Sequence, residues 1–172
     1  MNGFAIVILL GTVFGLEFFW PMKAITPADR DSTVEVAIAR NLGLYEEAAK
    51  AYSRDNLTFV GTFSDADLAA HFPSGYSKLE QWVAYRDASG NILVTTAGTL
   101  SSRFPPANLA RRLQDMKGKP FGIGVTKANV IVSAQNVSVS LSATGWTLPD
   151  DRIAVLTSVT APNAASAKAP GG

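Results

Sequence analysis

A long apolar run at the start of the chain constrains its fold more than any other feature. Residues 4–20 contain one ionisable side chain, Glu17, and most of the others are large and apolar. As a helix rising ~1.5 Å per residue, the run would be about 25 Å long, close to the ~30 Å hydrocarbon core of a bilayer. Trp20 suits the membrane interface, and a carboxylate is tolerated better near the end of a span than at its centre. The run predicts a single transmembrane helix, with residues 1–27 as anchor and linker.

A cleaved signal peptide is the competing interpretation of this run. It would need a basic beginning and small residues at the cleavage site. Here no lysine or arginine precedes Phe4, and the run ends in the bulky residues 18–21. A retained anchor is therefore favoured. The charges do not decide its orientation, because the basic and acidic residues that follow it are balanced.

Gly11 and Gly15 lie four positions apart inside the apolar run. Glycines at this spacing share one face of a helix and let two helices approach closely in lipid. The motif predicts that the anchor packs against itself or against another membrane helix.

The rest of the chain predicts an α+β domain over residues 28–160, beginning with an amphipathic helix. Residues 32–55 carry apolar side chains every three or four positions, and Ser32 with Glu35 forms a capping box that predicts the helix start. The inward positions are expected to be Val34, Ile38, Leu42, Tyr45, Ala49 and Tyr52, and the polar ones Arg40, Glu46, Glu47, Lys50 and Arg54.

Two further helices are indicated after this one. Residues 64–71 predict a short helix opened by Ser64. A third helix is expected from Pro105-Pro106 to Gly118, because proline suits the first helical turn and glycine suits the residue that ends a helix. Its inward positions are expected to be Leu109, Leu113 and Met116, and its exposed ones Arg111 and Arg112.

The remaining segments alternate between apolar runs and turn residues and predict an antiparallel sheet. Residues 81–86 and 91–96 read as a hairpin. Valines alternate with serines from 137 to 141, which is the pattern of a half-buried strand. Further strands are expected at 121–125, 129–133 and 153–159, and residues 161–172 are too poor in large apolar side chains to fold.

No set of residues forms a catalytic or metal-binding pattern. The chain has no cysteine, and its one histidine, His71, has only Asp65 and Asp67 nearby, whereas closed zinc sites need four ligands. The glycine-rich stretch at 118–124 lacks the ending of a phosphate loop. A net charge of +1 gives no indication of nucleic-acid binding. We therefore expect no enzyme activity, cofactor, metal or small-molecule substrate.

Exposed charged side chains are then the expected partner surface. Arg111 and Arg112 are the first candidates, because arginine is enriched at interface hot spots. The polar face of the long helix is the second, with Arg40, Glu47, Lys50 and Arg54.

Several landmarks resemble the PilM family, the inner-membrane proteins encoded with conjugative thin pili of the type IVb kind. They are the early anchor, the helix segments 39–45 and 48–52, the turn 73–76 before Trp82, the strand 91–94 and the closing segment 146–155. The resemblance covers residues 4–159. It implies a non-enzymatic pilus-assembly protein, anchored in the inner membrane with its body in the periplasm. Its implied partners are other proteins of the apparatus.

Two alternatives stay open. Gly3-Phe4 before an apolar run is similar to the cleavage junction of type IV pilins, which favours a minor pilin or pseudopilin built into the fibre. Against it, Ile8 stands where pilins carry a membrane glutamate. An anchored envelope hydrolase is supported only by the abundance of serine.

Overall fold

The computed structural model describes residues 27–100, 104–118 and 122–158. The expected anchor run at 4–20, with Gly11 and Gly15, and the expected tail at 161–172 lie outside these ranges. Among the residues described, no helix combines the length and the apolar character that a membrane span requires.

The first described element is the long helix α2 (Pro27–Asp55), and it begins earlier than the capping pattern predicts. Proline is well suited to the first helical position because its φ angle is already helical and its missing N–H has no partner there. Ser32 therefore lies inside the helix, and the predicted capping box with Glu35 is wrong. Glu35 binds residues of another helix instead.

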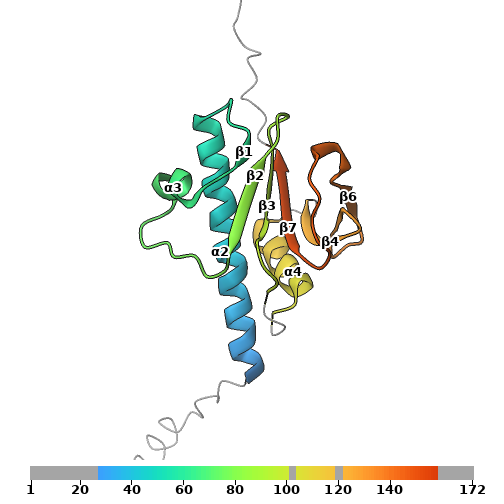
Figure 1. Ribbon diagram of the computed structural model, residues 1–172. Coiled ribbons are helices and arrows are strands. Elements are labelled where there is room, and N and C mark those ends of the chain that lie inside the picture. The colour runs from blue at the N-terminus through green and yellow to red at the C-terminus, as the bar shows by residue number, and fades with distance from the viewer. Residues whose placement is uncertain (1–26, 101–103, 119–121, 159–172) are drawn as a thin grey trace, which may run out of the picture. The chain divides into compact units, whose positions relative to one another are not determined.

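In the described part of the chain the sheet has seven strands, all antiparallel to their neighbours, which confirms the α+β class (Figure 1). Their order across the sheet is β1-β2-β3-β7-β4-β5-β6, so the last strand in sequence pairs between two earlier ones. The strands are β1 (Gly61–Thr62), β2 (Trp82–Arg86), β3 (Asn91–Thr96), β4 (Ile123–Lys127), β5 (Val130–Val132), β6 (Ser138–Ser140) and β7 (Ile153–Ser158). The expected strand at 121–125 is found two residues later, as β4.

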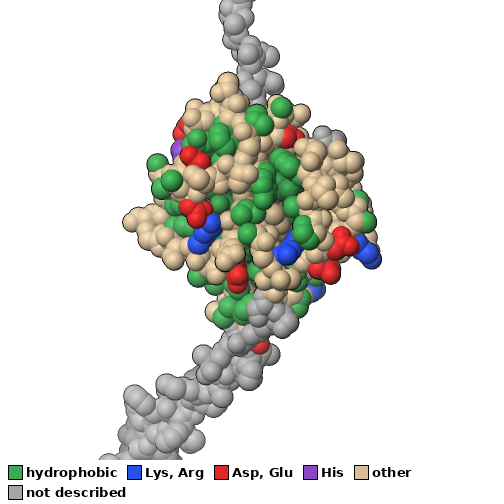
Figure 2. All heavy atoms as spheres, viewed as in Figure 1, with side chains coloured by type: hydrophobic (Ala, Val, Ile, Leu, Met, Phe, Trp, Pro, Cys, Tyr) green, Lys and Arg blue, Asp and Glu red, His purple; other side chains and the backbone are tan. Residues whose placement is uncertain are grey.

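Alternating side chains along the central strands build a separate apolar cluster on each face of the sheet. Ile92 and Val94 of β3 face the cluster that contains α2 and α4 (Pro106–Lys117), whereas Leu93 faces the second cluster. Trp146 and Leu148, from the segment between β6 and β7, pack against that second cluster. Figure 2 looks onto the face opposite α2, and hydrophobic side chains gather over its middle. Apolar side chains therefore pack on both faces of the sheet.

The short helices show the terminal residues that the sequence predicts. Ser64 caps α3 (Asp65–Leu68) in a reciprocal capping box with Asp67, and a 3₁₀ turn, η1 (Ala69–His71), follows. A second 3₁₀ turn, η2 (Ser142–Thr144), follows β6. Gly118 ends α4 in the left-handed conformation, with φ of 60°, which favours glycine because it has no Cβ.

Three expected orientations are wrong. Val34 and Met116 were expected in the core, but they are 40% and 46% exposed. Glu46 was expected on the polar face of the long helix, but it is buried at the contact between α2 and α4. The helices approach closely at Gly43, where an added Cβ would lie 3.2 Å from Leu113 Cδ1. The spacing of apolar residues along α2 could not predict that Glu46 is buried, because its charge is compensated by Lys117 from the other helix.

Candidate functional site

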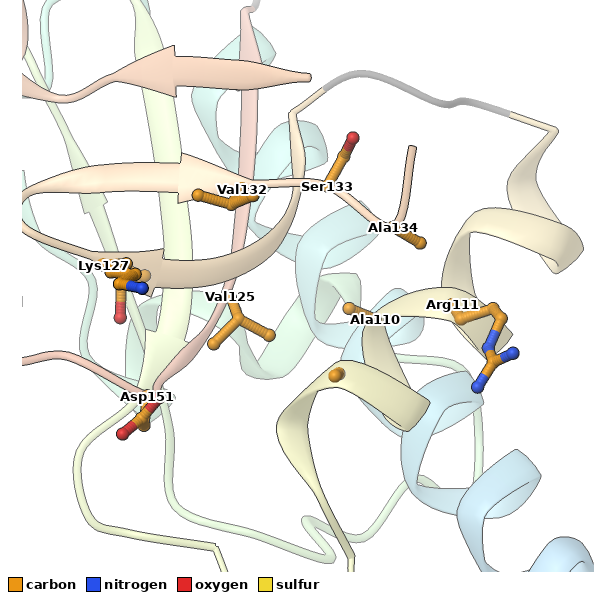
Figure 3. A pocket seen from close by; sticks show the side chains of 10 residues that line it. Ala110, Arg111, Val125, Lys127, Val132, Ser133, Ala134 and Asp151 are labelled. Atoms are coloured by element: carbon orange, nitrogen blue, oxygen red, sulfur yellow. The ribbon is translucent and has the colours of Figure 1, made fainter. Parts of the chain in front are cut away.

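A pocket of about 420 Å³ lies between α4 and the β4–β5 hairpin (Figure 3). Its apolar lining includes Ala110 from α4, Val125 from β4 and Val132 from β5. In Figure 3, Ala110 on the helix and Val125 on the strand lie on opposite sides of the hollow. The pocket offers apolar surface at a place where the helix layer ends.

The order of the strands explains why this hollow exists. α4 packs mainly on β4 and β7, so the helix layer does not extend over β5. Val125 and Val132 are cross-strand partners, and their side chains therefore lie on the same face of the sheet. Gly124 precedes them, and a Cβ at this position would collide with the backbone carbonyl of Val132. The missing side chain lets β5 follow β4 closely beside the pocket.

Charged side chains stand at both ends of the pocket. Lys127 and Asp151 lie at one end, and Arg111 lies at the other, where its guanidinium points away from them (Figure 3). Within the described ranges, no ion pair involves any of these three side chains. Their charges are therefore accessible to a binding partner.

The two candidate arginines of α4 have different surroundings. Arg112 Nε lies 3.8 Å from Glu35 Oε2, so Arg112 is paired with α2. Arg111 donates a hydrogen bond of 3.3 Å to Asn108 Oδ1, and Asn108 in turn donates one of 3.2 Å to Glu35 Oε1. All four residues line a second, polar hollow of about 300 Å³, next to the first pocket along α4. Arg111 thus stands at the border between an apolar and a polar hollow.

Two of the candidates on α2 belong to an ion cluster between helices. Lys117 of α4 donates to both Glu46 and Glu47, and Lys50 lies 3.0 Å from Glu47 Oε1. Glu47 binds Lys117 of α4 and Lys50 binds Glu47, so both are less available to a partner. Arg40 and Arg54 are exposed.

The ion cluster shifts the ionisation of its members. Burial raises the pKa of the Glu47 carboxyl, but hydrogen bonds and charges from Lys117 and Lys50 outweigh burial and lower the pKa to about 2. Burial lowers the pKa of Lys117, and the two glutamates more than reverse this, so that its pKa is raised. Both groups therefore stay charged at neutral pH.

The Glu47 pKa predicts a loss of stability in acid. A carboxyl with a lowered folded-state pKa stabilises the fold fully above its unfolded value of 4.5 and ceases to do so as the pH falls toward 2. Its side chain is 52% exposed, so solvent screening limits the contribution to under about 1 kcal/mol. Urea unfolding at pH 5 and pH 2.5 should show a smaller acid loss in Glu47→Gln than in the wild type. Equal losses in both would contradict this assignment.

The structure assigns separate partners to the residues weighed for a metal site. Asp65 binds Lys78 and Tyr45, the Asp67 carboxylate accepts hydrogen bonds from Ser64, and His71 lies 3.9 Å from Asp55 and packs edge-on against Tyr52. No group of three or more potential metal ligands occurs among the residues described.

Sequence reasoning missed the part of the pocket that comes from the sheet. Lys127 and Val132 carry no recognisable motif, and they meet Arg111 only because β4 and β5 lie beside α4. The one sequence signal for this region was the arginine pair on α4.

Comparison with known proteins assigns the family. The PilM family model matches residues 18–156, which is most of the chain. The chain belongs to the PilM family. No curated protein and no solved structure matches it. Membership of PilM gives the protein a role related to pilus assembly, and the match covers α2, α4 and all seven strands except the end of β7.

Proposed function

We propose that this PilM protein is a non-enzymatic component of the assembly machinery of a type IV-like, conjugative thin pilus. It is anchored in the bacterial inner membrane by residues 4–20, with its body in the periplasm, and it acts through protein–protein contacts. The family match supports the role in pilus assembly, and the apolar run supports the anchor.

The observation that carries the contact surface is the position of Arg111. It is exposed at the edge of an apolar pocket whose other end holds Lys127. Arginine is enriched at binding hot spots, and these lie in pockets from which the partner excludes water. The pocket therefore fits a partner segment that places an apolar side chain between α4 and β5 and an acidic group near Arg111.

Arg111→Ser in the full chain is expected to weaken partner binding by roughly 2 kcal/mol, or about thirtyfold, and to reduce piliation and liquid mating. Arg112 is left unchanged because its pairing with Glu35 joins α4 to α2. Arg54→Ser is the matched control, since it removes the same charge from the far end of α2. Mating at the wild-type frequency with Arg111→Ser would overturn the proposed surface, and a defect confined to Arg54→Ser would move it to α2.

Fractionation of the same cells tests the proposed location in the inner membrane. The full-length chain should fractionate with the inner membrane, and recovery from the soluble periplasmic fraction would refute the anchor. A minor pilin is the second candidate, because α2 leads into an antiparallel sheet. The mass of the purified chain separates the two: loss of residues 1–3 with a methylated Phe4 identifies a pilin.

A further inference from the structure

The strand β6 forms one edge of the sheet, and the proposed function makes no use of it (Figure 1). It pairs with β5 on one side. An edge strand presents a row of backbone N–H and C=O groups that can pair with a strand of another chain. The other side of β6 is therefore available to a strand of another chain.

The hydrogen bonds around β6 show which of its backbone groups face outward. Ser133 N–H donates to Val137 O at 2.9 Å, and Leu141 N–H donates to Asn129 O at 3.1 Å. Bonded residues alternate along an antiparallel pair, so Val139 also faces β5. Ser138 and Ser140 therefore direct their N–H and C=O groups away from the sheet. Among the residues described, these outward groups have no hydrogen-bond partner.

The β6 edge is short, but it lacks the charged side chains and the proline that often prevent edge strands from pairing. Natural edge strands are commonly protected by charged side chains or proline. No Asp, Glu, Lys or Arg occurs between Lys127 and Asp150, and no proline occurs between Lys127 and Pro149. At the opposite edge, β1 has only two residues. The β6 edge is thus open to a partner strand.

The sequence of β6 is symmetric about Val139. Serines stand on either side of it, and the aliphatic residues Val137 and Leu141 stand beyond them. Two such strands, placed antiparallel around a two-fold axis at Val139, would set Ser138 opposite Ser140 of the second copy. The outward-facing groups lie on these two serines, so this register satisfies all of them.

We propose that β6 pairs with β6 of a second copy of this chain in that register, which would join the two sheets across the axis. The two Val139 side chains would then be direct neighbours on the face where Val139 already packs against the second apolar cluster. A shift by one residue would place the outward-facing backbone groups of Ser138 and Ser140 opposite residues whose N–H and C=O groups point back into their own sheet. The pairing is thus specific in register.

The contact is small, and we therefore expect it to be weak. Three residues on each side bury far less than the ~800 Å² per partner of a standard stable interface. The pair should therefore be weak in dilute solution and should form where copies are held at high local concentration. This inference rests on β6 alone and is independent of the pocket at Arg111.

Disulfide cross-linking tests the register directly, because the chain has no cysteine. At a non-hydrogen-bonded antiparallel pair the Cα atoms lie ~4.5 Å apart, within the range that a disulfide can bridge. In cells oxidised with copper phenanthroline, full-length Val139→Cys should give about tenfold more covalent dimer than Thr62→Cys, the control on the exposed β1 edge. A yield equal to that of the control would overturn the proposal.

Charged substitutions in β6 test whether the cross-link depends on the β6–β6 strand pair or on some other contact between copies. Lysine at both Ser138 and Ser140, or glutamate at both, should reduce cross-linking of Val139→Cys to the control level, because like charges would face each other across the axis. Mixing the lysine and glutamate chains should restore it. Both serines are exposed, so the urea-unfolding midpoints of these variants should match that of the Val139→Cys parent. Failure of the mixed chains to recover cross-linking would also overturn the pairing.

Discussion

Lys117→Met is expected to lower the free energy of unfolding by about 3 kcal/mol, because it leaves a buried carboxylate without its main cation. The carboxylate belongs to Glu46, whose side chain is only 3% exposed and binds Lys117 across the α2–α4 contact. Among the residues described, Lys50, at 3.9 Å, is the other cation near Glu46. Methionine keeps most of the apolar stem of lysine, so the loss reports charge more than packing. Urea unfolding at pH 7 measures the change.

A double-mutant cycle provides the control for this prediction. Glu46→Gln in the Lys117→Met background removes the uncompensated charge and should recover most of the lost stability. Lys50→Met should cost much less, because Lys50 contacts mainly the half-exposed Glu47. If Lys117→Met and Lys50→Met destabilise equally, the cluster is a surface network and Glu46 is not held as described.

Asn41→Ala is expected to cost about 3 kcal/mol and to release the segment 73–81 from α2. The Oδ1 atom of this buried residue accepts from Trp82 Nε1 at 2.7 Å and from Leu79 N at 3.0 Å, and its Nδ2 donates to Ser77 O at 2.8 Å. Trp82 is 1% exposed. Removing the acceptor leaves the indole N–H buried without a partner, and such a loss costs ~1–3 kcal/mol before the other bonds are counted.

Two measurements separate a local release from general destabilisation. The urea-unfolding midpoint reports the stability, and the rate of tryptic cleavage at Lys78 reports the release of the segment. Asn56→Ala is the matched control, because the Asn56 side chain makes one exposed hydrogen bond, to Tyr52 O. Its cleavage at Lys78 should match the wild type. An Asn41→Ala chain with unchanged stability and unchanged cleavage would contradict the role assigned to Asn41.

Local sequence signals predicted most of the elements and their ends. The 3.6-residue periodicity indicated α2, whose inward residues Leu42 and Tyr45 are buried. Ser64 and Gly118 marked the ends of α3 and α4 because capping depends on only a few neighbouring residues. The strands of the β2–β3 hairpin were predictable for the same reason, since two apolar runs flank a short turn.

The pairing of distant segments could not be predicted from these signals. No residue near Ile153 indicates that β7 pairs between β3 and β4, because an apolar strand fits several positions in an antiparallel sheet. The same limit applies to the site. The arginine pair on α4 was visible in the sequence, but only the fold shows that Arg112 meets Glu35 and that Arg111 borders a pocket with Lys127 at its far end.

The sequence by itself determined the α+β class, the Ser64 cap of α3, the Gly118 end of α4 and the alternation of β6, because such signals depend on residues close to one another in the chain. The tertiary structure alone decided which charged side chains are available to a binding partner. Glu46 is buried and Arg112 is paired because α4 lies against α2, whereas Arg111 lies on the side of α4 that borders the pocket. A charge is neutralised or exposed according to which distant element packs beside it, and that depends on the burial of apolar surface by the whole domain.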